Sequence, residues 1–253
     1  MISVRHATLK KGRSLILDDV TVELPSGALI AVIGPNGAGK TSLLRLMAGL
    51  DHPDSGDVLV TEKSLSQLTG EERATTLSWV PTDSPLPFAF TALETVILGR
   101  FATSKGAPGR TDTEKSRAAL AALGVQDLAD RTITTLSSGE RQKVMVARSL
   151  AAECPVMILD EPLANLDIAA SLHLLKLLKS RTALGTTVCA SFHDIILARK
   201  HADYVVLLAG GKVKAVGPAE KTLSSEHIRE VFGVNTTIAH SSDGKSLLEF
   251  QLP

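Results

Sequence analysis

The sequence contains few cysteines, few aromatic residues and no long apolar run, and these shortages exclude several classes of protein. Cys154 and Cys189 lack the CxxC or Cys/His companion of a metal site, so we expect two small buried residues in a reducing compartment. No signal-peptide pattern opens the chain, and apolar runs such as Leu29–Ile33 are far shorter than the about 20 residues of a membrane-spanning helix. Lys and Arg number 27, as do Asp and Glu, so no overall basic field attracts nucleic acid or anionic lipid. Any anion site must be local, and at a membrane other chains must do the spanning.

The 253 residues suit one large α/β domain, or one domain with a sizeable insertion. Short apolar segments predict strands buried on both faces at residues 29–33, 156–159 and 187–190. Helical spacing follows the first strand over residues 42–50, and residues 51–56 are typical of a loop. Before the third strand, Leu172, Leu175 and Leu178 are expected on one face of a helix. Residues 204–208 and 212–216, joined by two glycines, predict a hairpin.

The middle of the chain has a mostly helical pattern, at residues 93–98, 114–123 and 138–152, with a Gly/Pro/Ser-rich loop at residues 103–111. Strands that alternate with helices predict a parallel sheet, so the helical stretch is an insertion. We expect one domain over residues 1–253, with a core of residues 1–82 and 156–253 and a helical subdomain of residues 83–155. The tail, residues 236–252, has a turn pattern at residues 242–244.

A glycine-rich segment between the first strand and its helix fits the phosphate-loop pattern G-x-x-x-x-G-K-[ST]. It comprises Gly34, Pro35, Asn36, Gly37, Ala38, Gly39, Lys40 and Thr41. Glycines allow the close approach that lets successive N–H groups surround an anion, and the following helix adds its positive end. In this pattern Lys40 reaches the β- and γ-phosphates, Thr41 binds Mg²⁺, and Ser42 adds a phosphate contact. The segment predicts a site for Mg²⁺ with ATP; an ordinary glycine-rich turn is the alternative.

The strand at residues 156–159 ends in two acids, Asp160 and Glu161. A strand beside the phosphate loop can hold Asp160 near Mg²⁺, usually through water. Glu161 leaves the strand in a different direction and could polarise the attacking water as a general base, which typically contributes about 10²–10⁴-fold. Taken alone, the two acids are equally well explained as a strand end that faces solvent. Beside a phosphate loop they predict nucleotide hydrolysis.

Together with three further motifs, these residues resemble the ATP-binding-cassette (ABC) ATPases over essentially the whole chain. Residues 136–142, LSSGERQ, look like the family signature, residues 164–167 like its D-loop, and residues 192–194 like the segment of its switch histidine. All five motifs stand in the family order. The resemblance implies an α/β, P-loop (RecA-like) fold with a mainly parallel sheet core and an inserted α-helical subdomain.

The resemblance also implies how two copies cooperate. In the family the signature of one subunit faces the γ-phosphate held by the other, so that two chains enclose two ATP molecules head to tail. Here the second anion site is at Ser137, Ser138, Gly139 and Glu140, where hydroxyls and free N–H groups meet at a helix start; a simple N-cap is the alternative. By the same resemblance Glu161 and His193 are catalytic, with His193 holding the γ-phosphate and the water. Thr41 and Asp160 bind Mg²⁺, and Asp167 crosses to the partner's site.

Two positions depart from the family pattern. Three residues after Trp79 the family usually has a Gln that meets Mg²⁺ and reports to the membrane subunit. This chain has the shorter Thr82 at that position, and a water or Asp83 is the alternative contact for Mg²⁺. The family also stacks adenine on an aromatic side chain shortly before residues 17–20, yet no Phe, Tyr or Trp precedes Trp79. Because such stacking contributes about 1–3 kcal/mol for bases, we expect weaker ATP affinity or relaxed base selectivity.

Softer similarities, at residues 95–100, 192–198 and 228–234, resemble the importers of iron-siderophores, haem and vitamin B12. They imply an ATP-hydrolysing importer subunit at the cytoplasmic face of the bacterial inner membrane. Its partners would be a second copy, two transmembrane permease subunits and, indirectly, an extracytoplasmic substrate-binding protein, with no nucleic acid. The helical insertion would dock the permeases; Phe88, Phe90 and Leu93 are candidate contacts or, equally, core residues of the insertion.

Other functions stay open at this point. A soluble ATPase of DNA repair or translation usually has two cassettes or a long coiled-coil insertion, and the sequence has neither. Thr82 and the missing aromatic side chain are compatible with a regulatory module of low turnover. A small-molecule kinase uses a phosphate loop but needs no second anion site. An ABC ATPase of another importer or of an exporter carries the same five motifs, because other chains select the cargo.

Overall fold

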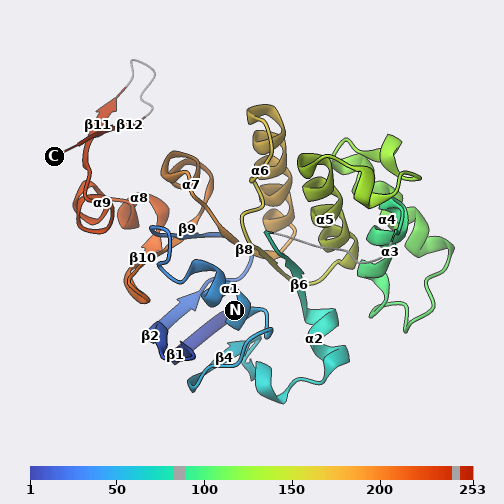
Figure 1. Cartoon of the computed structure of the whole chain (residues 1–253), viewed down its shortest axis with the longest axis horizontal. Helices are drawn as coiled ribbons and strands as arrows, with labels where there is room; N and C mark the ends of the chain where they lie inside the picture. Colours follow the sequence, from blue (N-terminus) through green and yellow to red (C-terminus); the bar gives the residue numbers. More distant parts are fainter. Residues whose placement is uncertain (83–88, 241–245, 253) are drawn as a thin grey trace.

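A six-stranded sheet forms the centre of the molecule (Figure 1). The structure, a computed structural model, describes residues 1–82, 89–240 and 246–252. The strands run in the order β10 (Lys212–Pro218), β9 (Tyr204–Ala209), β3 (Leu29–Ile33), β8 (Thr187–Ser191), β7 (Val156–Leu159) and β6 (Leu77–Val80). Neighbours are parallel except β10, which forms the predicted hairpin with β9. The predicted strands at residues 29–33 and 156–159 are confirmed at the same bounds, and the third runs one residue further, to Ser191.

Alternate residues of β3 face two different hydrophobic cores. Leu29, Ala31 and Ile33 belong to the core that holds the long helices, whereas Ile30 and Val32 belong to the core on the opposite face. A strand covered on both faces needs an apolar side chain at every position. This explains why the segment is apolar throughout rather than alternating.

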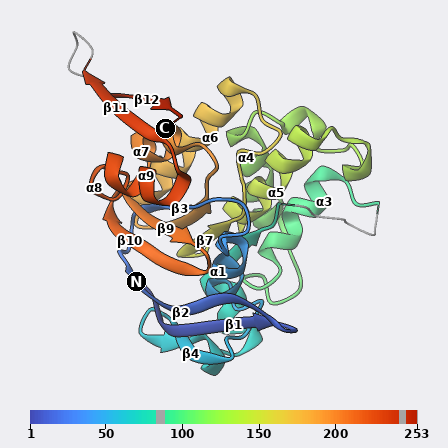
Figure 2. The same cartoon turned by 60° about the vertical axis from the view of Figure 1, so that its left-hand side comes forward.

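A second sheet of four antiparallel strands was not predicted from the sequence. It runs in the order β2 (Ser14–Leu24), β1 (Ile2–Lys11), β4 (Ser55–Val60) and β5 (Lys63–Ser64), and it lies below the central sheet in Figure 2. The predicted loop at residues 51–56 is therefore wrong from Ser55 onwards. In β2, Val20, Val22 and Leu24 are buried while the residues between them are exposed. Such half-buried strands alternate in polarity, which is typical of antiparallel sheets.

Helix α1 (Lys40–Met47) contributes to the core between the two sheets and buries Leu43, Leu44, Leu46 and Met47. It begins two residues before the predicted helix and ends three earlier, because Gly49 turns the chain with a φ of 66°. Two more helices, α6 (Ile168–Ala183) and α7 (Ile195–His201), cover the opposite face.

The predicted apolar stripe on α6 is wrong at one position. Leu174, Leu175 and Leu178 are buried, but Leu172 is 42% exposed. Steps of three residues fall short of the 3.6-residue turn, so Leu172 and Leu178 lie well apart around the helix.

The chain between β6 and β7 is helical, and these helices gather on one side of the sheet (Figure 1). They are α3 (Ala92–Ile97), η2 (Leu98–Arg100), α4 (Arg110–Ala122), η3 (Gln126–Leu128), η4 (Ile133–Thr135) and α5 (Ser138–Ala152). The prediction for α5 is confirmed at both ends, and α3 lies one residue earlier than predicted. Helix α4 begins at Arg110, so the predicted loop is wrong at its last two residues, because Asp112 accepts the Gly109 N–H at 2.9 Å and caps the helix earlier.

A buried arginine ties these helices together. The Arg100 side chain, 8% exposed, donates to Asp112 Oδ1 and to Glu153 Oε2, each at 2.9 Å, and to the Ala151 carbonyl oxygen at 2.8 Å. The Gly109 N–H, with help from Arg100, lowers the pKa of Asp112 to about 2. The start of α4 is thus joined to the end of α5.

The remaining elements are short. They are η1 (Leu65–Gln67), α2 (Gly70–Thr76), α8 (Ala219–Thr222), α9 (Ser225–Phe232) and a terminal ribbon of β11 (Asn235–His240) and β12 (Ser246–Gln251), which stands away from the sheets in Figures 1 and 2. The predicted turn at residues 242–244 lies outside the described residues. Across the described ranges, no helix has the length and apolarity of a membrane span. Both cysteines are buried and free, as predicted, and burial raises the pKa of Cys154 to about 11 and of Cys189 to about 12.

Candidate functional site

Four parallel strands deliver the predicted site residues to one edge of the central sheet. The phosphate loop follows β3, Asp160 and Glu161 follow β7, His193 follows β8, and Thr82 follows β6. In parallel strands the carboxyl ends meet at the same edge, which is where ligands bind in open α/β sheets. The topology therefore brings together motifs that are far apart in the sequence.

The phosphate loop has the backbone that its glycines permit. Gly37 and Gly39 have φ angles of 78° and 100°, and a Cβ on Gly34 would lie 2.3 Å from the Leu208 carbonyl oxygen. Pro35, Asn36 and Ala38 fill the loop, and α1 begins at Lys40 directly after it. The first N–H groups of α1 thus adjoin the loop, an arrangement that suits an anion.

Lys40 folds back onto the phosphate loop. Its side chain donates to the carbonyl oxygens of Gly34 at 2.7 Å and Pro35 at 3.0 Å, and the residue is only 7% exposed. Burial lowers the pKa of Lys40, while the nearby carboxylates of Glu161 and Asp160 act in the opposite direction. Next along α1, Thr41 is exposed and Ser42 is buried.

Asp160 is almost fully buried, at 2% exposed. Its Oδ1 accepts a hydrogen bond from Ser191 Oγ at 2.7 Å, and the Glu161 N–H donates to the same Ser191 oxygen, also at 2.7 Å. Strand β6 holds the segment from the other side, since the Asp160 N–H donates to the Val80 carbonyl oxygen at 2.8 Å. Asp160 is thus held from two neighbouring strands, its carboxylate by β8 and its backbone by β6.

Glu161 and His193 are in direct contact. His193 Nε2 lies 2.7 Å from Glu161 Oε1, and the side chains are 53% and 27% exposed. Both line a hollow of about 240 Å³, together with Ser191 and the apolar side chains of Leu163, Phe192 and Leu197. The backbone of Glu161 has a φ of 49°, uncommon for a residue with a side chain, and it turns the chain away from β7. A carboxylate and an imidazole therefore face an open space at the end of the sheet.

Thr82, at the position where the family pattern has an amide, is directed at the backbone of the next strand. Its Oγ1 lies 3.5 Å from the Asp160 carbonyl oxygen, so the hydroxyl is directed at the backbone between β6 and β7. The alternative partner, Asp83, and the candidate docking residue Phe88 lie outside the described residues. Leu93 is partly buried against the main core, which favours its interpretation as a core residue of the insertion.

The signature residues form the start of α5. Ser137 is the N-cap: its Oγ accepts the Glu140 N–H at 3.3 Å, and Glu140 Oε2 accepts the Ser137 N–H at 2.9 Å. The N–H of Ser137 is the main cause of the lowered pKa of Glu140. Ser138 is exposed just behind this cap. Ser137 and Glu140 thus satisfy each other, as a capping box does.

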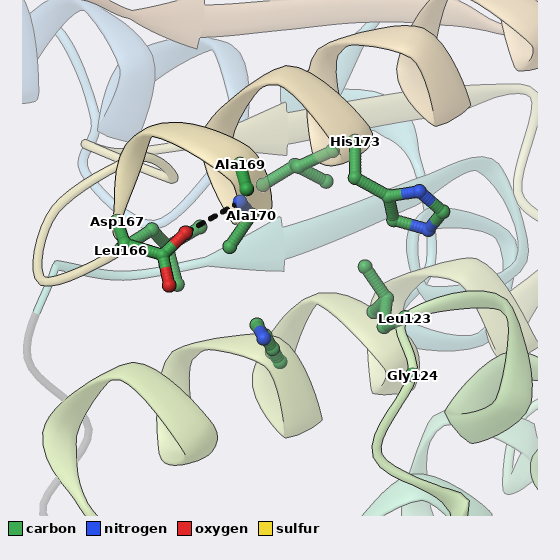
Figure 3. A pocket seen from close by; sticks show the side chains of 9 residues that line it. Leu123, Gly124, Leu166, Asp167, Ala169, Ala170 and His173 are labelled. Atoms are coloured by element: carbon green, nitrogen blue, oxygen red, sulfur yellow. Dashed lines mark hydrogen bonds between the residues drawn. The ribbon is translucent and has the colours of Figure 1, made fainter.

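The D-loop packs against the signature within one chain. A Cβ on Gly139 would lie 2.6 Å from the Asn165 carbonyl oxygen. Asp167 caps α6 by accepting the Ala170 N–H at 2.7 Å, as Figure 3 shows. Beside it, α5, α6 and the end of α4 enclose a hollow of about 340 Å³, where His173 Nε2 donates to the Ala122 carbonyl oxygen at 2.7 Å.

The described residues form two separate groups. Within the described ranges, no hydrogen bond or ion pair joins residues 137–140 to residues 34–42. The phosphate loop, Asp160, Glu161 and His193 lie at one sheet edge, whereas residues 137–140 of the signature and Asp167 share the junction of α5 and α6. Gln142, the last residue of the signature motif, reaches the first group through the Glu161 carbonyl oxygen, 3.4 Å from its Nε2. The predicted site residues of one chain thus fall into two groups.

Sequence reasoning missed two contacts at the sheet edge. Ser191 bonds both Asp160 and Glu161, and Gln142 Nε2 lies 3.4 Å from the Glu161 carbonyl oxygen. Ser191 carried a signal, because it is a polar residue at the end of an apolar strand, two positions before His193. Gln142 carried a weaker one, as a buried amide in the first turns of α5.

Comparison with known proteins identifies the family. The ABC transporter family profile matches residues 17–164, more than half of the chain. The chain belongs to the ABC transporter family. A hemin import ATP-binding protein of Gloeobacter violaceus is 39% identical over 230 residues, which cover 88% of this chain and 84% of that protein. A cobalamin import ATP-binding protein of Halobacterium salinarum is 37% identical over 224 residues, which cover 88% of this chain and 56% of that protein.

Solved structures agree on the fold. A chain of a structure described as a metal-chelate type ABC transporter in an inward-facing conformation matches with a TM-score of 0.83 and 27% identity, over 99% of this chain and 96% of that one. A dimeric ATP-binding cassette bound to ADP and phosphate, MJ0796, matches with a TM-score of 0.78 and 27% identity, over 87% of this chain and 99% of that one. The chain is an ABC-type ATPase with the predicted P-loop fold.

Proposed function

We propose that this ABC ATPase hydrolyses ATP at the edge of the central sheet, with Glu161 as general base. The observation that carries the proposal is the 2.7 Å contact between Glu161 and His193 beside the phosphate loop strand. Residues 34–42 would surround the phosphates, and Lys40 would exchange its loop carbonyl partners for phosphate oxygens. The exchange keeps a buried ammonium group paired before and after ATP binds.

The donor set fits a magnesium ion that arrives with ATP. Mg²⁺ prefers oxygen ligands and in such sites takes one or two from the protein and the rest from phosphate and water. Thr41 and Asp160 offer a hydroxyl and a carboxylate, and no cluster of three or more His, Cys, Asp or Glu in the described ranges would hold an ion alone. When bound, Mg²⁺ neutralises charge that develops on the phosphate oxygens.

The hydrolytic step that we propose uses Glu161 and His193 together. Glu161 accepts a proton from the attacking water at a side-chain oxygen. His193 donates from Nε2 to Oε1 and so orients the carboxylate before the nucleotide arrives. After ATP binds, His193 would turn toward the γ-phosphate and hold it together with the water.

We further propose that the complete site forms between two copies of the chain. The signature residues Ser137, Ser138, Gly139 and Glu140 and the D-loop residue Asp167 make up a half-site that is not joined to the phosphate loop of its own chain. A two-fold dimer would give each phosphate loop the signature of its partner. The dimeric state of the related cassette MJ0796 supports this arrangement.

The relatives suggest a role in uptake. We propose that the chain energises import of haem, an iron-siderophore complex or cobalamin, because relatives at 39% and 37% identity are named for hemin and cobalamin import. It would lie on the cytoplasmic face of the inner membrane and act with two permease subunits and an extracytoplasmic substrate-binding protein. Residues 83–155 would form the helical subdomain that docks the permeases, and residues 1–82 and 156–253 the core. Leu98 and Phe101 expose apolar surface there.

Phosphate release from Mg-ATP by the purified chain tests the proposal, with Glu161→Gln as the matched variant. We expect the variant to keep ATP binding and to lose about 10²–10⁴-fold in turnover, since it keeps the shape but not the base. Equal rates for both proteins would overturn the role of Glu161. A wild-type chain that binds ATP without turnover, even with its permeases, would favour the regulatory module that Thr82 leaves open.

A further inference from the structure

Ser191 lies where three parts of the site converge. It is the last residue of β8, is 1% exposed, and pairs in register with Val32 of β3, the strand that leads to the phosphate loop. On the other side of β8 lies β7, which delivers Asp160 and Glu161. His193 follows two residues later.

The hydroxyl of Ser191 makes two short bonds. A serine hydroxyl has one hydrogen to donate and two lone pairs that accept. Its hydrogen goes to Asp160 Oδ1 and its oxygen accepts the Glu161 N–H, each at 2.7 Å. Hydrogen bonds to a carboxylate are about twice as strong as those between neutral groups. One atom thus fixes the rotation of the Asp160 carboxylate and the direction in which the chain leaves β7.

The turn that it holds is a strained one. Glu161 has a φ of 49°, and residues with side chains hold such angles only where their surroundings enforce them. Ser191 holds the backbone N–H of Glu161, and His193, from the same segment, holds its side chain. The end of β8 therefore fixes Glu161 at both its backbone and its carboxylate.

We propose that Ser191 is a positioning residue, which sets Asp160 for the metal and Glu161 for the water as a single unit. The inference rests on the proposed roles of these two acids. Ser191 itself touches neither nucleotide nor water in this scheme; it acts through its two neighbours. Loss of its hydroxyl therefore affects metal binding and turnover together, whereas a purely structural serine would affect stability alone.

A matched control exists on β6, on the far side of β7 from Ser191. Ser78 of β6 is also buried, at 8% exposed, and its hydroxyl bonds Ser149 Oγ at 2.6 Å. It has no bond to Asp160 or Glu161 among the described contacts. Ser78→Ala and Ser191→Ala thus each remove one buried hydroxyl group from the central sheet.

The first experiment compares these two variants with the wild type. For Ser191→Ala we expect the half-saturating Mg²⁺ concentration to rise and kcat to fall, each by about tenfold, the size of one lost bond to a charged group. Ser78→Ala is expected to change neither, whatever its effect on the melting temperature. Ser191→Thr, which keeps the hydroxyl, is expected to recover both values. Should Ser191→Ala fail to fold, Ser191→Cys replaces it, because a thiol keeps the shape of the side chain but forms only weak hydrogen bonds.

The second experiment measures the metal without turnover. In the Glu161→Gln background with ATP, Mn²⁺ titration followed by electron paramagnetic resonance reports binding directly, and the Ser191→Ala change is expected to weaken it by about tenfold. Hydrogen exchange of the segment around residue 161, without metal, is expected to quicken. Unchanged Mn²⁺ affinity, or a Ser191→Thr variant of normal stability that stays inactive, would overturn the proposal.

The outcomes also separate this inference from the proposed function. If Glu161→Gln hydrolyses ATP normally, the role of the general base fails and takes the inference with it. If Glu161→Gln is inactive while Ser191→Ala matches the wild type in kcat and metal dependence, the inference alone fails.

Discussion

Gly139→Ala perturbs the contact that joins the signature to the D-loop inside one chain. The added Cβ would lie 2.6 Å from the Asn165 carbonyl oxygen, whereas an ordinary contact begins near 3.4 Å. The backbone must therefore open by about 0.8 Å. Asn165 yields little, because it has a φ of 61°, and its oxygen belongs to the backbone rather than to a flexible side chain.

The magnitude follows from two opposing effects. Overpacking of this kind typically costs about 1–3 kcal/mol, while alanine stabilises a helix by up to about 1 kcal/mol relative to glycine. Gly70→Ala isolates the second effect, because Gly70 starts α2 behind the same kind of capping box, Thr69 with Glu72, and an added Cβ meets nothing within 4 Å. The difference between the two variants is therefore the cost of the clash, about 1–3 kcal/mol.

Thermal or urea unfolding without nucleotide measures this difference. For a chain of this size each 1 kcal/mol corresponds to about 2–4 °C in Tm. We expect the Tm of Gly139→Ala to lie below that of Gly70→Ala by about 2–4 °C for each 1 kcal/mol that the clash costs. Loss of ATPase activity alone would not decide the matter, because a phosphate contact at Gly139 predicts the same loss. Equal melting of the two variants would refute the packing of the signature on the D-loop.

Three further predictions concern chemistry and pH. His193→Ala should preserve ATP binding and abolish turnover, and near-normal phosphate release would contradict its role. ATP and GTP should bind with similar affinity, because the segment beside Gly39 of the phosphate loop carries the aliphatic Ile16 and Leu17 instead of an aromatic ring; a strong preference for ATP in competition binding would count against this. Asp112→Asn should lower stability at neutral pH. The folded pKa of Asp112 is about 2, against an ordinary value of 3.8. The stabilisation is therefore complete only above about pH 5 and is lost as the pH falls toward 2, so the difference in unfolding free energy between wild type and variant should narrow over that range. A difference independent of pH would show that the ionised carboxylate contributes nothing.

The sequence predicted best the elements whose pattern has a single physical cause. Strand β3 is apolar because both of its faces are covered, and α5 begins at a serine cap, so both were placed at their observed bounds. Strands β1 and β2 were missed because half-buried strands alternate in polarity and carry no motif. Leu172 was misplaced because three-residue spacing alone does not follow the helical turn.

The candidate site was predictable only as far as its motifs reach. Asp160 and Glu161 were expected beside the phosphate loop because a buried strand ends at them, and His193 was expected at the same site from the family resemblance. Ser191 was not expected there, because its role depends on β8 lying between β3 and β7, and a single sequence does not reveal the order of strands in a sheet. The contact of Gly139 with Asn165 was hidden for the same reason, since it joins the start of α5 to the turn that precedes α6.

Mixed dimers test the central claim, that each ATP is hydrolysed between the phosphate loop of one copy and the signature of the other. Lys40→Ala disables the first half-site, and Ser138→Glu places a repelling charge in the second. Each variant alone should be inactive. An equal mixture should recover roughly one quarter of the wild-type rate, because half of the dimers are mixed and each has one intact site of two. A mixture that forms mixed dimers yet stays inactive would contradict the account.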